Sequence, residues 1–99
     1  MREYYVYMLR CQDGSLYIGV TNDVQKRLEQ HQQGSDPLSY TYSKRPVELV
    51  YVESFRDVRD AIASEKRMRG WSHEKKEALI QNDIRRLKVL SRRKKEMSH

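Results

Sequence analysis

The chain has 99 residues, which is enough for one domain around a single modest core and leaves little room for a second. Residues 1–55 contain 6 basic and 7 acidic residues, whereas residues 56–99 contain 14 basic and 7 acidic residues. The net charge of +6 therefore belongs to the C-terminal half. Such an asymmetry indicates a polyanionic partner. The alternative, that Lys and Arg merely solvate exposed helices, explains any single charge but explains the imbalance less well.

Cys11 is the only cysteine, which excludes an internal disulfide and a cysteine-based zinc site. No apolar stretch typical of a signal peptide precedes the first strand pattern, and no segment has the length and apolarity needed to cross a bilayer. We therefore expect a cytoplasmic protein with no membrane and no disulfide partner, acting as a monomer.

Aromatic and β-branched residues predict strands over residues 4–11 and 16–21, joined as a hairpin through Asp13-Gly14. With a two-residue turn, the residue numbers of two directly opposed positions sum to 27. Tyr7 and Tyr17 then point to opposite faces of the sheet. A turn of odd length or a bulge brings both tyrosines to one face. If both tyrosines serve one site, the turn is not the simple two-residue type.

Asn22 predicts the N-cap of a helix that runs to about Gln33 and stops at Gly34. Within that helix Arg27 and His31 are four residues apart, so they project from the same side. Both are therefore available to one site.

The remaining elements are a loop over residues 35–44, a strand over 47–55, a helix over 57–70 and a helix that starts at Ser72 and is broken near Asn82-Asp83. The strand is apolar enough to be covered on both faces at its centre. Residues 91–99 lack an apolar period, and we expect fraying or disorder there. The prediction is one mixed α and β (α+β) domain over residues 1–90, a three-stranded antiparallel sheet flanked by helices in the order strand, strand, helix, strand, helix, helix.

Glu65 calls for a physical reason, because it falls on the expected inner stripe of its helix. The apolar positions of that stripe are Val58, Ala61, Ile62 and Met68. A carboxylate there is costly unless something pairs with it. Glu65 is therefore the acidic residue with the strongest case for a functional role.

Tyr7, Tyr17, Arg27, His31 and Glu65 together supply what phosphodiester hydrolysis needs. A hydroxyl can deprotonate water, a guanidinium can meet the charge of a five-coordinate phosphorus, an imidazole can move a proton, and a carboxylate can hold a divalent metal. Each residue alone also fits an ordinary structural role, such as a sheet aromatic, a surface ion pair or a partly buried histidine.

The spacing of these residues resembles the GIY-YIG nuclease superfamily, and more closely its small single-domain bacterial members. The resemblance runs from about Tyr4 to Leu79. The matching segments are Tyr5-Val6-Tyr7, Tyr17-Ile18-Gly19, Thr21-Asn22-Asp23, Arg27, His31, Gly34, Arg45-Pro46 and Glu65-Lys66.

The resemblance implies a divalent-metal-dependent endonuclease acting on nucleic acid, with DNA the expected substrate. A domain this small has limited surface for direct base readout, so we expect a preference for structure or strand over a long specific sequence. It implies that Tyr7 or Tyr17 is the base that activates water, with His31 assisting and Arg27 on the phosphate. Glu65 would hold Mg²⁺ or Mn²⁺, since one carboxylate with the scissile phosphate and water suffices for magnesium.

Nucleic-acid contacts are expected outside this group as well. Aromatic and basic side chains interleave around residues 40–45, which suits stacking on bases and contact with phosphates, and the basic tail can add salt-sensitive affinity. The predicted contact residues are Tyr42, Lys44, Arg45, Lys66, Arg92, Arg93, Lys94 and Lys95.

The chain departs from the family pattern at three positions. Tyr5 replaces the glycine of the first motif, Val20 stands where many relatives carry lysine, and Asn82 is the only nearby candidate for a late asparagine. The last two changes leave open a second hypothesis, a DNA- or RNA-binding module with little cleavage activity. A third, a small protein whose basic face binds an acidic protein surface, lacks a sizeable exposed apolar helix face to support it.

Overall fold

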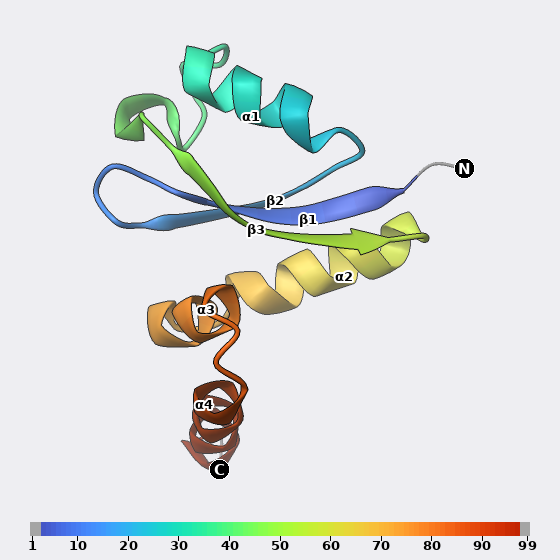
Figure 1. Cartoon of the computed structure of the whole chain (residues 1–99), viewed down its shortest axis with the longest axis vertical. Helices are drawn as coiled ribbons and strands as arrows, with labels where there is room; N and C mark the ends of the chain where they lie inside the picture. The colour runs from blue at the N-terminus through green and yellow to red at the C-terminus, as the bar shows by residue number, and fades with distance from the viewer. Residues whose placement is uncertain (1–2, 98–99) are drawn as a thin grey trace. The chain divides into compact units, whose positions relative to one another are not determined.

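The computed structural model describes residues 3–97 and the side chains of residues 3–92, and its N-terminal part is a three-stranded sheet with a helix on each face (Figure 1). The chain divides into two compact units, Met1–Arg69 and Gly70–His99. Unit 1 contains β1 (Tyr4–Arg10), β2 (Leu16–Thr21), α1 (Val24–Gln33), a short 3-10 helix η1 (Tyr42–Lys44), β3 (Glu48–Phe55) and α2 (Val58–Arg69). Unit 2 contains α3 (His73–Ile80) and α4 (Ile84–Met97). This composition confirms the predicted α+β class, with one more helix than expected.

The sheet has the order β2-β1-β3, and both neighbours of β1 run antiparallel to it. Because β1 is the central strand between the two helices, its residues Val6 to Leu9 are buried on both faces. β3 lies at the edge, and Val52 at its centre is 44% exposed. The expectation that the third strand is covered on both faces is therefore wrong, because apolarity does not reveal which strand is central.

The β1–β2 turn contains three residues, 12–14. A backbone hydrogen bond from the N–H of Cys11 to the carbonyl of Ser15 closes it at 2.8 Å. Gly14 takes a φ of +86°, a left-handed conformation that suits glycine and is usual in three-residue hairpin loops.

This turn decides the register of the hairpin. Tyr7 lies opposite Gly19, and Leu9 lies opposite Tyr17. Opposed positions therefore sum to 26 and the two-residue alternative is excluded. Because side chains alternate along a strand, Tyr7 and Tyr17 lie on the same face of the sheet.

α1 covers that face, with His31 buried on it and Leu28 packed against the Tyr7 cluster. Its N-cap is Asp23, whose side chain accepts a hydrogen bond from the backbone N–H of Lys26 at 3.0 Å. The prediction of Asn22 as the cap is wrong by one residue, since both residue types cap well. Gly34 ends the helix with a φ of +66°, as its sequence position predicts.

α2 packs against all three strands, and Figure 1 places it across the sheet from α1. Its buried residues are Ala61, Ser64 and Met68, whereas Val58 and Ile62 are 36% and 40% exposed. The predicted inner stripe is therefore only half correct, because small side chains fit where the helix approaches the sheet.

In unit 2 the helix predicted from Ser72 is divided into α3 and α4 at the predicted break near Asn82-Asp83. Asn82 has a φ of +56°, which interrupts the helix, and Asp83 accepts a hydrogen bond from the N–H of Arg86 to start α4. α4 runs to Met97, where fraying or disorder was expected, and the side chains beyond Arg92 lie outside the described residues. Within the described range, no helix has the length and apolar character of a membrane span.

Candidate active site

Tyr7 is the centre of the candidate site. It is 1% exposed, and its hydroxyl is hydrogen-bonded to Nε2 of His31 at 3.0 Å. Across the hairpin, a Cβ at Gly19 would lie 2.5 Å from the Tyr7 hydroxyl oxygen, closer than any real contact. Glycine at this position therefore leaves the space that the Tyr7 ring occupies.

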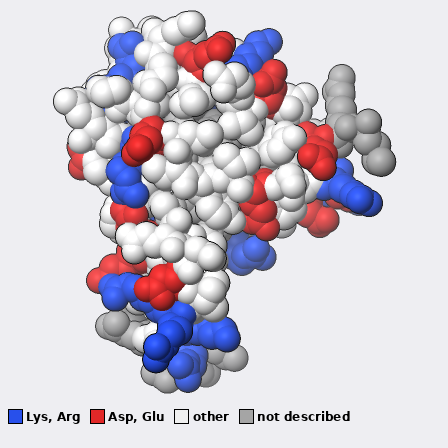
Figure 2. Space-filling model, viewed as in Figure 1, with Lys and Arg blue, Asp and Glu red and all other residues white. Residues whose placement is uncertain are grey.

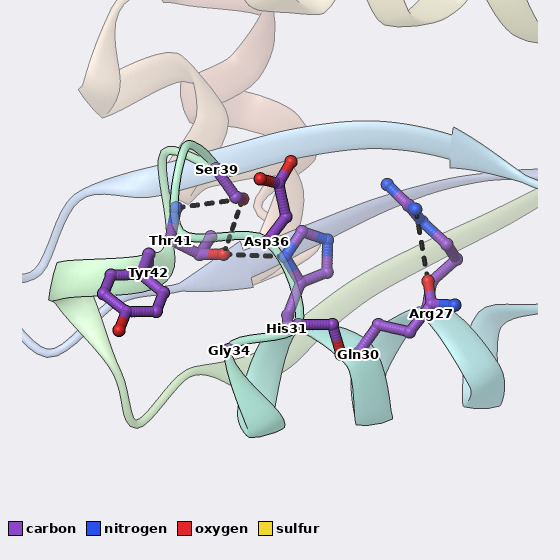
Figure 3. Close-up of a pocket in the computed structure, with 9 residues that line it drawn as sticks. Arg27, Gln30, His31, Gly34, Asp36, Ser39, Thr41 and Tyr42 are labelled. Atoms are coloured by element: carbon purple, nitrogen blue, oxygen red, sulfur yellow. Dashed lines mark hydrogen bonds between the residues drawn. The ribbon is translucent and has the colours of Figure 1, made fainter.

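His31 joins α1 to the following loop. It is 7% exposed, and its Nδ1 is 2.7 Å from Oγ1 of Thr41, which is itself 1% exposed. Thr41 Oγ1 also lies 3.1 Å from Oγ of Ser39. Figure 3 shows this chain of hydrogen bonds running from the imidazole into the loop.

Tyr17 lies beside this pair and is half-buried. Its ring centroid is 6.2 Å from that of Tyr7 and 5.0 Å from that of His31. Tyr40 stacks on it at 6.1 Å, and Nζ of Lys44 lies 4.7 Å from the Tyr40 ring. Tyr40 thus contacts both the Tyr17 ring and the Lys44 ammonium.

Arg27 completes the group on this face. Burial raises the pKa of Tyr7 to about 12. A hydrogen-bonding interaction of the Tyr7 hydroxyl with Arg27 lowers this pKa, but it offsets only part of the effect of burial. Nη1 of Arg27 donates to Oε1 of Gln30 at 3.2 Å. Its Nε is buried and, among the described residues, has no hydrogen-bond partner. A buried donor of this kind is costly, so an incoming acceptor would be favourable.

The charge of His31 follows from the same surroundings. Burial lowers its pKa from the ordinary value of 6.5, and the charge of Arg27 lowers it further. His31 is therefore neutral at pH 7, with one ring nitrogen protonated and the other free to accept a proton.

A pocket of about 250 Å³ opens beside this group (Figure 3). Every residue that lines it except Gly34 carries a polar or charged group. The residues that line it are Arg27, Gln30, His31, Gly34, Ser35, Asp36, Ser39, Thr41 and Tyr42. Two of the predicted catalytic residues thus border a space that a small polar group can enter.

Glu65 comes from α2, on the other side of the sheet from α1 (Figure 1). Its side chain is 12% exposed, and Oε2 is 2.7 Å from Nη2 of Arg69. Among the described residues the same oxygen lacks a partner with hydrogen-bond geometry, so the two side chains form a close but poorly aligned ion pair. Within the described part of the chain, no interaction joins Glu65 to Tyr7 or His31. Its membership of a shared site stays a prediction.

The donor set at Glu65 is compatible with magnesium. The described residues contain no group of three or more His, Cys, Asp or Glu that is placed to hold a metal ion. Magnesium commonly binds through one or two carboxylates, together with water and substrate phosphate. An incompletely bonded, nearly buried carboxylate oxygen fits that chemistry, with Arg69 as its competitor for the charge.

The predicted nucleic-acid contacts in the loop also have structural partners. Arg45 donates from Nε to the carbonyl of Tyr42 at 2.8 Å, and its guanidinium lies 4.7 Å from the Tyr42 ring. The Arg45 guanidinium also packs against Gly34, where an added Cβ would lie 2.5 Å from Nη1 of Arg45. Lys44 forms a 2.6 Å ion pair with Asp13. These contacts hold the loop in place, and contact with nucleic acid stays a prediction.

The other predicted contacts lie on helices. Lys66 is exposed on α2, and Arg92 is exposed on α4. Figure 2 shows basic side chains gathered over α4, where Arg85, Arg86 and Lys88 are also exposed. The side chains of Arg93, Lys94 and Lys95 lie outside the described residues.

The sequence did not identify Thr41 as part of the site. It is one of several hydroxyl residues in a loop, and neither a helix or strand periodicity nor a charge distinguishes it from the others. Gly19 was found through its motif, but its contact with Tyr7 depends on the hairpin register.

Residues 3–78 match the GIY-YIG catalytic domain, a nuclease-type domain. Because the match covers most of the chain, the chain belongs to the GIY-YIG family, and the resemblance carried by its motifs is confirmed.

Its relatives in this family are small bacterial proteins named UPF0213. A UPF0213 protein of Bacillus pumilus is 47% identical over 78 residues, which are 79% of each chain. A UPF0213 protein of Bacillus halodurans, solved by solution NMR, has a TM-score of 0.53 at 37% identity and covers 80% of this chain and 83% of its own. A solution NMR structure of a protein from E. faecalis has a TM-score of 0.59 at 30% identity, with 83% and 86% covered. These relatives establish the family and the fold, and their names state no activity.

Proposed function

We propose that the protein is a divalent-metal-dependent endonuclease that hydrolyses phosphodiester bonds in DNA, with preference for a structure over a sequence. The observation that carries this proposal is the cluster of Tyr7, Tyr17, Arg27 and His31 on one face of the sheet. Phosphoryl transfer to water requires a base that accepts a proton from the water and a cation, here a guanidinium, that stabilises the charge on the phosphate.

The two tyrosines have different parts in this proposal. Tyr7 is buried and its pKa is about 12, so it keeps its proton at neutral pH and cannot meet water directly. Tyr17 is half-buried, and we assign to it the contact with the attacking water. As Tyr17 takes a proton from water, it passes its own proton to the Tyr7 oxygen, and Tyr7 passes its proton to Nε2 of His31, so each hydroxyl ends the step with one proton.

Arg27 stabilises the phosphate. A guanidinium donates two parallel hydrogen bonds to phosphate oxygens, and the unpaired Nε of Arg27 gains a partner when an acceptor arrives. Glu65 would hold the metal, which when bound supplies positive charge to the phosphate and its leaving group.

A second candidate is a nucleic-acid-binding module, for DNA or RNA, with little cleavage. It is favoured by the Glu65–Arg69 ion pair, which occupies the carboxylate that a metal needs. It is also favoured by Val20, an apolar side chain at a position where the family pattern often has lysine.

The deciding experiment incubates the protein with labelled duplex, branched and single-stranded DNA and RNA, with Mg²⁺, Mn²⁺ or chelator. Glu65→Gln should bind substrate like the parent and lose metal-dependent cleavage, because it keeps the volume and removes the charge. Arg69→Gln is the matched control, since it removes the ion pair and keeps the carboxylate, and it should still cleave. Cleavage by Glu65→Gln at the parent rate, with the same metal requirement, would exclude Glu65 as the ligand. Binding without cleavage by the parent under every condition would favour the second candidate.

A further inference from the structure

We propose that Thr41, supported by Ser39, is a positioning residue that holds His31 in the tautomer protonated at Nδ1, so that Nε2 is left to accept the proton of Tyr7. This inference rests on the proposed nuclease function, in which His31 is a proton acceptor. The observation behind it is the buried series Tyr7, His31, Thr41 and Ser39, with separations of 3.0, 2.7 and 3.1 Å.

Two arrangements of hydrogens fit these distances. In the first, Tyr7 donates to Nε2, Nδ1–H donates to Thr41, and Thr41 donates to Ser39. In the second, every hydrogen bond is reversed, so that Nε2–H donates to Tyr7 and Nδ1 accepts from Thr41. Only the first leaves His31 with a free base on the side of the tyrosines.

Three features favour the first arrangement. Arg27 is a donor that interacts with the Tyr7 hydroxyl, so in the second arrangement the Tyr7 oxygen would accept from both Arg27 and His31, and the Tyr7 hydrogen would need another acceptor. Ser39 is less buried than Thr41, so its own hydrogen can turn toward the polar pocket that it lines. A protonated His31 donates from both nitrogens, and in the first arrangement Thr41 already accepts from Nδ1. No hydroxyl then has to reorient during proton transfer.

Thr41 is well placed to impose this choice. It is 1% exposed, and among the described residues its hydroxyl is the hydrogen-bond partner of Nδ1, so this hydroxyl influences which ring nitrogen carries the hydrogen. Its main-chain N–H also lies 3.4 Å from Ser39 Oγ, which keeps the two residues together. The role is to position His31 and not to contact substrate.

The test is the ring ¹⁵N chemical shifts of His31 in the full-length protein without substrate, at a pH where the imidazole is neutral. The parent should have a protonated Nδ1 and an unprotonated Nε2. Thr41→Val keeps the shape and removes the hydroxyl, so the Nε2–H tautomer should increase. Thr41→Ser keeps the hydroxyl and should retain the parent spectrum. Ser39→Ala removes the acceptor for the Thr41 hydrogen and should also increase the Nε2–H tautomer.

Cleavage rates then link the tautomer to the reaction. Thr41→Val should lower the rate about ten- to a hundredfold with little change in substrate binding, and Thr41→Ser should restore it, as expected for a group that orients a functional histidine. A parent protonated at Nε2, or a Thr41→Val protein with an unchanged tautomer, would overturn the inference. So would a shifted tautomer with an unchanged rate.

The two proposals fail in different ways. If no protein, including the parent, cleaves any nucleic acid tested, the proposed function fails while the ring-nitrogen spectra still decide the role of Thr41. If Thr41→Val does not fold, as judged by its amide spectrum, Ser39→Ala and Thr41→Ser still provide the opposed results.

Discussion

Gly19→Ala should destabilise the protein through its contact with Tyr7. The added Cβ would lie 2.5, 2.6 and 2.8 Å from the Oη, Cζ and Cε1 atoms of Tyr7, against an optimal carbon separation of about 3.5–4.0 Å. Tyr7 cannot move freely, because it is 1% exposed and its hydroxyl is hydrogen-bonded to His31. Overpacking of this kind costs about 1–3 kcal/mol, a large share of the about 5–15 kcal/mol by which small proteins are stable.

Urea unfolding of single and double variants measures this contact. Gly14→Ala is a control for backbone strain alone, since Gly14 has a positive φ and its Cβ would meet nothing within 4 Å. Replacing Tyr7 with Leu removes the ring, so in that background Gly19→Ala should cost less by about 0.5–3 kcal/mol, while the cost of Gly14→Ala should not change. An equal cost of Gly19→Ala in both backgrounds would refute the close packing of Tyr7 on Gly19.

Three further predictions concern charge and proton transfer. Burial lowers the pKa of His31 below 6.5 in the folded protein. As the pH falls below about 6.5, the unfolded chain therefore binds a proton that the folded chain does not, and stability is lost. Thermal unfolding of His31→Gln should depend less on pH in this window. Replacing the four basic residues 92–95 with Gln should weaken nucleic-acid binding at low salt and flatten its salt dependence, and an unchanged slope in a binding titration would assign these charges to solvation. Tyr17→Phe keeps the ring that stacks on Tyr40, so it should unfold like the parent and lose cleavage, and retained cleavage would remove Tyr17 from the role of base.

The order of elements and most of the site cluster could be predicted from the sequence, because their signals are local. The turn residues, the cap at Gly34 and the four-residue spacing of Arg27 and His31 each depend on a few neighbouring positions. The shared face of Tyr7 and Tyr17 was left open by the sequence, since it depends on whether the turn holds two residues or three.

The remaining features depend on tertiary packing, which the sequence pattern does not encode directly. Apolarity suggested that Val58 and Ile62 are buried, but the approach of α2 to the sheet selects the smaller Ala61 and Ser64. Thr41 reaches His31 only through the path of a loop, and a hydroxyl in a loop carries no period that singles it out.

Arg27 and Glu65 share a property that links stability to the proposed activity. Their Nε and Oε2 atoms are the buried side-chain polar atoms that lack a hydrogen bond among the described residues. Such atoms lower the stability of the free protein. Proteins retain them at functional sites, where a bound ligand provides the missing partner. A phosphate provides acceptors for Arg27 and a divalent cation provides a partner for Glu65, so the two costs would be relieved by the two components of one substrate complex. Supporting this account would require stabilisation by nucleic acid and metal together that exceeds the sum of their separate effects, because the phosphate is itself a ligand of the metal.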